Sequence, residues 1–221
     1  MSATIKHCEL DIPSDLEFAA SDLDGLFAAS WKLIRYTGAI VIRRDVWLAR
    51  EKEKYYGSYW TDVCVIFQER LPGPSILLSR KLISVRMENQ SWLSKWFEVF
   101  CVSWPRLVRG FPLSKEVQQL ACTEAPWENL YFLVLARAAG QYSIVEYHEH
   151  VQPQLQSRRK KLLALAVSVL PGVILNTYFV LRYSRVKGTS KRTELLLLTH
   201  SKFCLRRWRA AEGSGLVGCN S

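Results

Sequence analysis

The sequence predicts an α/β chain, with a few strands among helices in its first part and a mostly helical region after them. Two stretches, Thr37 to Ile42 and Leu82 to Arg86, have the composition of strands. The segments around them carry apolar residues at helical spacing. The last third of the chain combines apolar runs with clustered basic residues, which is typical of helices at a membrane surface.

The composition is that of a folded protein. The 221 residues suffice for one sizeable domain or two small ones, and 49% of them are hydrophobic while 23% are charged. Aromatic residues make up 12%, and Trp and Tyr rings suit the faces of sugars as well as ordinary cores. The six cysteines form no Cys-x-x-Cys pair, so we expect free thiols and a reducing compartment.

The net charge of +10 is placed unevenly along the chain. Residues 1–156 hold 17 Lys and Arg against 18 Asp and Glu, a net charge of −1. Residues 157–221 hold 13 against 2, a net charge of +11. A basic segment mixed with apolar runs favours an anionic membrane surface over nucleic acid. The sequence also contains no zinc-finger or RNA-binding signature.

Local signals predict where the helices begin and end, because Asp and Ser cap helix starts while Gly and Pro stop helices. The predicted helices are 22–34, capped by Asp22 or Asp24; a short helix capped by Asp45; a helix from Tyr59 to Pro72; 92–108, with a break at Pro105; 114–122, capped by Ser114; 127–139, ended by Gly140; and 142–152. The predicted strands are Thr37–Ile42, Ser75–Ser79 and Leu82–Arg86.

The twenty residues from Leu162 to Leu181 are mostly apolar and just reach the length of a membrane span. Pro171-Gly172 interrupts them at the centre, which favours two short helices that dip into one leaflet. A true span and a pair of buried core helices are the alternatives. Basic residues flank the segment on both sides and are expected to contact the membrane: Arg158, Arg159, Lys160, Lys161, Arg182 and Arg185.

The stretch from Tyr36 to Trp92 orders its features as an α/β enzyme does. It opens with the predicted strand, passes through the aromatic-rich Tyr55-Tyr56-Gly57-Ser58-Tyr59-Trp60-Thr61-Asp62, and ends with a second strand that leads to Arg86 and Asn89. This order resembles the later half of inverting family 2 glycosyltransferases of the GT-A fold. The likeness is to bacterial enzymes of O-antigen and related surface polysaccharide synthesis, such as abequosyltransferases. It extends from Asp22 to Tyr183 and implies a partial GT-A (Rossmann-like) remnant.

The resemblance implies that the nucleotide-binding half of such an enzyme is absent from this chain. In the family, that half ends a hydrophobic strand with metal-binding aspartates, far upstream of the segment that matches Tyr36. Asp22-Leu23-Asp24 has the letters of that motif but opens a helix, so capping is the expectation. The resemblance implies Mg or Mn in the complete enzyme, with ligands not present here. We therefore expect a glycosyltransferase fragment that is inactive alone.

The resemblance makes Asp62 the candidate catalytic residue. In the family, a carboxylate in this region deprotonates the acceptor hydroxyl, which then displaces the nucleoside diphosphate with inversion. A general base must lie within hydrogen-bond reach of that hydroxyl. The alternative interpretation is an aspartate in the first turn of a helix, stabilised by the helix dipole and without function.

Substrate or phosphate contacts are expected from residues near Asp62. The resemblance implies that Arg86, Asn89 and Trp92 lie near the donor diphosphate and the acceptor, where Arg can hold phosphate bidentately. The aromatic loop could form a sugar platform from Tyr56, Tyr59 and Trp60. The alternatives are an Arg86 that pairs with a surface carboxylate and aromatic rings that belong to the core.

These inferences predict four parts: a lead-in at 1–21, an acceptor-side half at 22–140, a basic and apolar membrane-associating region at 141–210, and a disordered tail at 211–221. The expected partners are a nucleotide-sugar donor, a polyprenyl-linked or glycan acceptor, an anionic membrane and a separate donor-binding half, but not nucleic acid. The expected location is the cytoplasmic face of the inner membrane, peripheral or partly inserted. A non-catalytic membrane-surface interaction protein is the second hypothesis.

Overall fold

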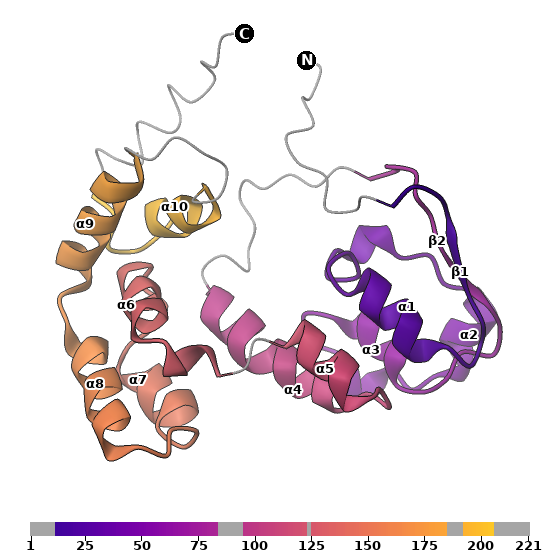
Figure 1. The fold of residues 1–221 in the computed structure, drawn as a ribbon, viewed down its shortest axis with the longest axis horizontal. Coiled ribbons are helices and arrows are strands. Elements are labelled where there is room, and N and C mark those ends of the chain that lie inside the picture. The colour runs from indigo at the N-terminus through magenta and orange to yellow at the C-terminus, as the bar shows by residue number, and fades with distance from the viewer. Residues whose placement is uncertain (1–11, 84–94, 123–124, 185–191, 206–221) are drawn as a thin grey trace, which may run out of the picture. The chain divides into compact units, whose positions relative to one another are not determined.

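The computed structural model describes residues 12–83, 95–122, 125–184 and 192–205, and these residues are mostly helical (Figure 1). Contacts divide the chain into two compact units. The first unit comprises Met1–Glu88 and Ser103–Glu124, and the second comprises Asn89–Val102 and Ala125–Ser221. The prediction of an α/β chain is confirmed only in part, because the described residues are mostly helical and contain one two-stranded sheet. The predicted boundary after residue 140 lies inside the second unit.

The first unit combines short helices with one two-stranded antiparallel sheet. Strand β1 pairs with strand β2 so that Leu16 lies opposite Leu77. Beyond the paired residues, the Asp15 carboxylate accepts hydrogen bonds from the Ser79 amide at 2.7 Å and the Ser79 hydroxyl at 2.8 Å. The elements are β1 (Leu16–Phe18), α1 (Leu23–Ser30), η1 (Thr37–Ala39), α2 (Arg44–Ala49), η2 (Glu53–Tyr55), α3 (Thr61–Phe67), β2 (Ser75–Leu77), α4 (Trp104–Arg109) and α5 (Lys115–Ala121).

Phe27 on α1 is the centre of an aromatic core in the first unit. Its ring is fully buried and meets the ring of Phe67 edge-on, with the centroids 4.9 Å apart. Trp104 stacks on Phe27 at 6.3 Å, and Phe111 lies 6.1 Å away. The indole of Trp104 also donates to the Ala121 carbonyl oxygen at 3.0 Å. The apolar spacing of the predicted first helix therefore serves this core.

The two aspartates of Asp22-Leu23-Asp24 bind backbone amides. Asp22 caps α1 by accepting from the Gly25 amide at 2.9 Å. Asp24 accepts from the Ser114 amide at 3.0 Å, and Ser114 in turn caps α5. Both carboxylates thus satisfy N–H groups at helix starts, which confirms the prediction that this pair serves capping.

The predicted strand from Thr37 to Ile42 is wrong. Residues Thr37–Ala39 form the short 3-10 helix η1, and the residues after it are irregular, with Val41 100% exposed. The two-stranded sheet of the described residues contains β1 and β2 only. A β-branched run becomes a strand when a neighbouring strand pairs with it, and this run has no such neighbour among the described residues. The predicted strand at 75–79 corresponds to β2.

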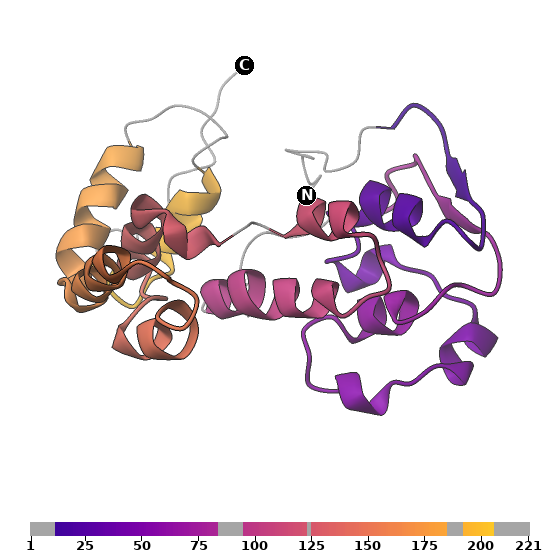
Figure 2. The same ribbon diagram turned by 60° about the horizontal axis from the view of Figure 1, so that its bottom comes forward.

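The second unit is a group of helices. Helices α8 and α9 lie along one side of it, with α6, α7 and α10 on the other side (Figures 1 and 2). Helix α6 contacts both α8 and α9, and α10 contacts α9. The elements are η4 (Phe97–Ser103, a π-helix), η5 (Pro126–Glu128), α6 (Leu130–Ala138), α7 (Ile144–Glu146), η6 (Tyr147–Val151, a π-helix), α8 (Arg158–Val169), α9 (Gly172–Ser184) and α10 (Arg192–Thr199).

Buried hydrogen bonds link the helices of the second unit to one another. The buried Asn176 amide on α9 donates to the Ala138 carbonyl oxygen at 3.0 Å and to the Leu198 carbonyl oxygen at 2.8 Å. It therefore links the ends of α6 and α10. Gly140 follows α6 with a positive φ of 76°, a conformation that favours glycine at a helix end, so the predicted stop is confirmed.

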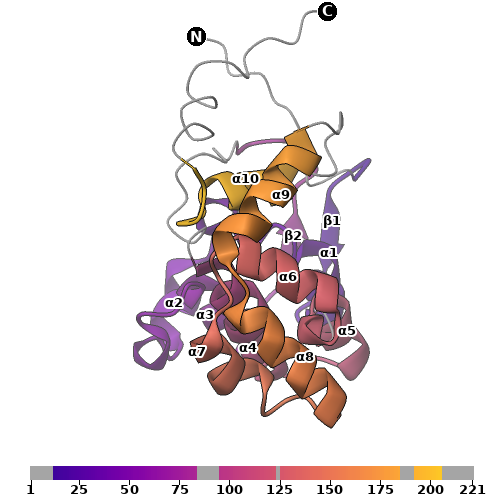
Figure 3. The ribbon, with the colours of Figure 1, turned by 90° about the vertical axis from the view of Figure 1, so that its left-hand side faces the viewer.

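The apolar segment from 162 to 181 is divided as the sequence predicts. Helices α8 and α9 meet at an angle of 88° around Leu170 and Pro171 (Figure 3). Pro171 lacks an amide hydrogen, so it cannot continue α8. No single helix among the described residues is long and apolar enough to cross a bilayer, and only the bent α8–α9 pair together reaches that length and composition.

Candidate active site at the start of helix α3

Asp62 lies in the first turn of α3, as the sequence predicts. Its carboxylate oxygen Oδ1 accepts a hydrogen bond from the Val63 amide at 3.0 Å. The other oxygen, Oδ2, is buried and has no hydrogen-bond partner among the described residues. Buried carboxylate oxygens are normally paired, so this atom is an exception that calls for an explanation.

The loop before Asp62 is held by its own hydrogen bonds. The Thr61 hydroxyl donates to the Tyr55 carbonyl oxygen at 2.9 Å, and the Ser58 amide donates to the same oxygen at 3.0 Å. Gly57 provides the positive φ of 84° that the turn requires. These contacts fix the backbone on which Asp62 stands.

The three aromatic candidates divide into exposed and buried residues. Tyr56 is 64% exposed and Tyr59 is 42% exposed, so both rings are accessible. Trp60 is buried, and its ring meets the Trp104 ring edge-on at 5.0 Å. The structure thus places Trp60 in the core rather than in a sugar platform, and the two tyrosines remain as candidates.

Cys64 is a buried neighbour of Asp62 on α3. The pKa of the Cys64 thiol is raised to about 11, mainly by burial, while a hydrogen bond with Ser58 opposes the increase and the Asp62 carboxylate adds to it. The neutral thiol therefore dominates at neutral pH. Cys64 acts as a small core residue and not as a nucleophile.

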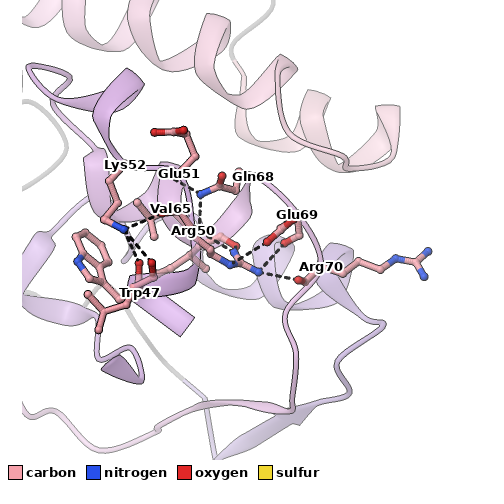
Figure 4. A network of polar contacts seen from close by, with 10 residues as sticks. Trp47, Arg50, Glu51, Lys52, Val65, Gln68, Glu69 and Arg70 are labelled. Atoms are coloured by element: carbon pink, nitrogen blue, oxygen red, sulfur yellow. Dashed lines mark hydrogen bonds and ion pairs between the residues drawn. The ribbon is translucent and has the colours of Figure 1, made fainter. Parts of the chain in front are cut away.

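Arg50 fixes the far end of α3 and was not identified from the sequence (Figure 4). Its buried guanidinium donates to the carbonyl oxygens of Val65 at 2.7 Å, Glu69 at 3.2 Å and Arg70 at 2.6 Å, and also to that of Ile66. The Glu69 carboxylate lies 3.5 Å from Nε and balances part of the charge. A cation at the C-terminal end of a helix satisfies its last carbonyl groups and its dipole.

Lys52 satisfies carbonyl groups at the C-terminal end of helix α2. Its ammonium group donates to the carbonyl oxygens of Trp47 at 3.1 Å and Arg50 at 2.8 Å (Figure 4). The connection between α2 and α3 therefore carries two basic side chains, each of which satisfies carbonyl groups at the end of one helix. These contacts hold in place the backbone on both sides of the loop that leads to Asp62.

The remaining predicted site residues Arg86, Asn89 and Trp92, together with Arg185, lie outside the described residues. The described residues contain no group of three His, Cys, Asp or Glu side chains that could hold a metal ion. Asp22 and Asp24 bind backbone amides, so they do not fit the metal site of a sugar-nucleotide enzyme.

Comparison of this chain with protein-family models, with curated proteins and with solved structures gives no match.

Proposed function

We propose that this chain is the acceptor-side part of a GT-A glycosyltransferase of bacterial surface polysaccharide synthesis. It would transfer a sugar from a nucleotide-sugar to a lipid-linked or saccharide acceptor at the cytoplasmic face of the inner membrane. The nucleotide-binding part and its divalent metal would be supplied from outside these 221 residues, so the chain alone would be inactive.

Asp62 is the proposed general base. Its carboxylate takes the proton from an acceptor hydroxyl while that oxygen bonds to the anomeric carbon of the donor sugar. The bond from the anomeric carbon to the diphosphate oxygen breaks on the opposite face, so the configuration inverts and the nucleoside diphosphate leaves with the electron pair. The exposed Tyr56 and Tyr59 offer rings against which the acceptor sugar can pack.

The single observation that carries this proposal is the unpartnered Oδ2 of Asp62. A carboxylate that only capped α3 would gain nothing by burying an oxygen without a donor, since such burial costs stability. A general base needs one free lone pair aimed at the proton that it removes. In this conformation solvent does not reach Oδ2, so the atoms that cover it must move before an acceptor can meet it.

The test is sugar transfer from nucleotide-sugars to polyprenyl-diphosphate acceptors, measured for the chain alone and for the chain joined to a nucleotide-binding half. We expect no transfer by the chain alone and measurable transfer by the joined protein. Asp62→Asn in the joined protein should lower the rate by about 10² to 10⁴, the usual contribution of a general base.

Asp45 provides the matched control, because it too is an aspartate in the first turn of a short helix. Its carboxylate is exposed and pairs with Arg43. Asp45→Asn should leave transfer unchanged. Equal transfer rates for the Asp62 and Asp45 variants would show that Asp62 is not the general base. Fast transfer by the chain alone would contradict the proposal that it needs a separate nucleotide-binding half.

A non-catalytic membrane-surface protein is the second candidate. It is favoured by the start of α8, whose first four residues are basic and are followed by apolar residues. If the chain binds vesicles tightly but transfers no sugar when joined to any nucleotide-binding half, this function is favoured over glycosyl transfer.

A further inference from the structure

Helices α8 and α9 lie along one side of the second unit (Figures 1 and 2), and both carry exposed apolar side chains. On α8 these side chains recur three or four residues apart and therefore share one helical face. The same spacing recurs on α9. The exposed row consists of Leu162, Ala166, Val169, Leu170, Val173, Ile174, Tyr178 and Leu181.

The opposite faces of the two helices attach them to the protein. Ala164 and Val167 of α8 belong to the buried cluster around Leu133 on α6. Phe179 and Val180 of α9 belong to the cluster around Leu198 on α10. The fold of the second unit thus uses one face of each helix and leaves the exposed row without a partner among the described residues.

Two free cations stand at one end of this row. Arg158 and Arg159 are exposed in the first turn of α8, one turn before Leu162. Neither forms an ion pair with a described residue, whereas the next residue, Lys160, pairs with Glu128. Cations at a helix start oppose the helix dipole, so the stability of α8 does not account for these two arginines.

We propose that α8 and α9 dock on an anionic phospholipid bilayer. The apolar row enters the acyl region, and Arg158 and Arg159 contact the lipid phosphates. The positive charge of the two arginines favours an anionic membrane as the binding partner. Apolar side chains with adjacent cations match the acyl chains and phosphates of such a leaflet. The bend of 88° prevents both helices from running along the bilayer normal, which favours a position along the surface over a straight span.

This inference locates the membrane contact of the proposed function on two helices. Its test involves no sugar transfer, so the docking surface and the transferase reaction can fail separately.

The full chain should be floated with vesicles of phosphatidylcholine alone and of phosphatidylcholine mixed with phosphatidylglycerol. We expect binding to the mixed vesicles and much weaker binding to the neutral ones. Arg158→Gln with Arg159→Gln should weaken binding to the mixed vesicles about 25-fold, since each basic residue near an anionic surface contributes about fivefold. The matched control removes two exposed arginines from α4, Arg106→Gln with Arg109→Gln, and should change binding little.

The apolar part is tested with Val169→Ser and Ile174→Ser, whose side chains are 63% and 67% exposed. The double variant should keep its circular dichroism spectrum and lose about tenfold in binding for each residue that leaves the acyl region. Leu120→Ser on α5, which is 54% exposed, is the control and should bind as the parent does.

Alkaline carbonate extraction then separates surface docking from insertion across the bilayer. Release of the protein supports docking on the surface, whereas retention overturns it in favour of a bent span. The proposal is also overturned if the Val169 and Ile174 substitutions leave vesicle binding intact. Equal binding to neutral and anionic vesicles would contradict the proposed contact between the two arginines and lipid phosphates. If the serine substitutions dissociate an oligomer, the exposed row binds a second copy of the chain instead.

Discussion

The guanidinium of Arg50 donates a hydrogen bond to the carbonyl oxygen of Val65 at 2.7 Å, and both groups are buried. This bond joins the residue after α2 to the last turn of α3, so it fixes the helix that carries Asp62. Burial lowers the pKa of Arg50, with the Glu69 carboxylate opposing that change, and arginine remains charged because its ordinary pKa is so high.

Replacing Arg50 with methionine should therefore destabilise the protein strongly. The carbonyl oxygens of Val65, Ile66, Glu69 and Arg70 would all lose a donor, and the expected loss in the free energy of unfolding is about 3 kcal/mol or more. Urea denaturation measures it. Arg43→Met is the control, since the ion pair of Arg43 with Asp45 is exposed, and it should change stability little. Equal losses in both variants would show that the Arg50 contacts do not stabilise α3.

Gly172→Ala should destabilise the start of α9. A Cβ at this position would lie 2.2 Å from Cε2 of the Phe203 ring. The guanidinium carbon of Arg137 lies 5.2 Å from the centroid of the same ring. Overpacking of this kind costs about 1 to 3 kcal/mol. Gly38→Ala provides the control, because a Cβ added to Gly38 would meet no atom within 4 Å, and thermal unfolding should show no loss. Equal melting temperatures would mean that Phe203 moves aside freely.

Local signals account for most of what the sequence predicted correctly. The caps at Asp22 and Ser114, the stop at Gly140 and the break at Pro171 each depend on a few neighbouring residues. The run after Thr37 was assigned wrongly because a strand depends on a partner elsewhere in the chain.

The same distinction separates the site residues. The position of Asp62 in a first helical turn follows from local apolar spacing. The burial of Trp60 depends on Trp104, and the role of Arg50 depends on carbonyl groups that begin fifteen residues later. Backbone carbonyl groups leave no trace in the side-chain pattern, so contacts such as those of Arg50 cannot be predicted from the sequence.

Stability should fall at alkaline pH, and Cys64 is one cause beside Cys101, whose thiol pKa burial raises to about 12. The folded state raises the pKa of the Cys64 thiol from about 9 to about 11 and so favours the neutral form. The unfolded chain loses the proton first as the pH rises, so the stabilisation present below about pH 9 is lost progressively towards pH 11. The loss from Cys64 is at most about 3 kcal/mol, since the shift spans two pKa units and each unit corresponds to about 1.36 kcal/mol.

Urea denaturation across this pH range measures that loss, and Cys64→Ala should reduce its slope. Cys122→Ala is the control, because burial also raises the pKa of Cys122 but the shift is smaller. A Cys64→Ala variant that keeps the full alkaline slope would assign the effect to other groups.

Arg158→Glu should stabilise the protein while it weakens membrane binding. A carboxylate at the start of α8 agrees with the helix dipole, so the free energy of unfolding should rise by about 0.5 to 1 kcal/mol. Arg109→Glu in the last turn of α4 is the control of opposite sign and should lower stability. Thermal unfolding and vesicle flotation of the same two variants test whether stability and binding change in opposite directions. A destabilised Arg158→Glu variant would show that Arg158 serves the fold.

Asp62→Ala should raise the stability of the isolated chain. Removing the carboxylate eliminates a buried oxygen without a partner, which costs about 1 to 3 kcal/mol. It also removes a favourable charge from the first turn of α3, which contributes about 0.3 to 1 kcal/mol. The first effect is larger, so the expected net gain is about 1 kcal/mol in urea denaturation. Asp45→Ala, which removes an exposed carboxylate paired with Arg43, should instead lower stability slightly. If both substitutions destabilise the chain equally, Asp62 is an ordinary helix-start residue and its burial carries no sign of a catalytic role.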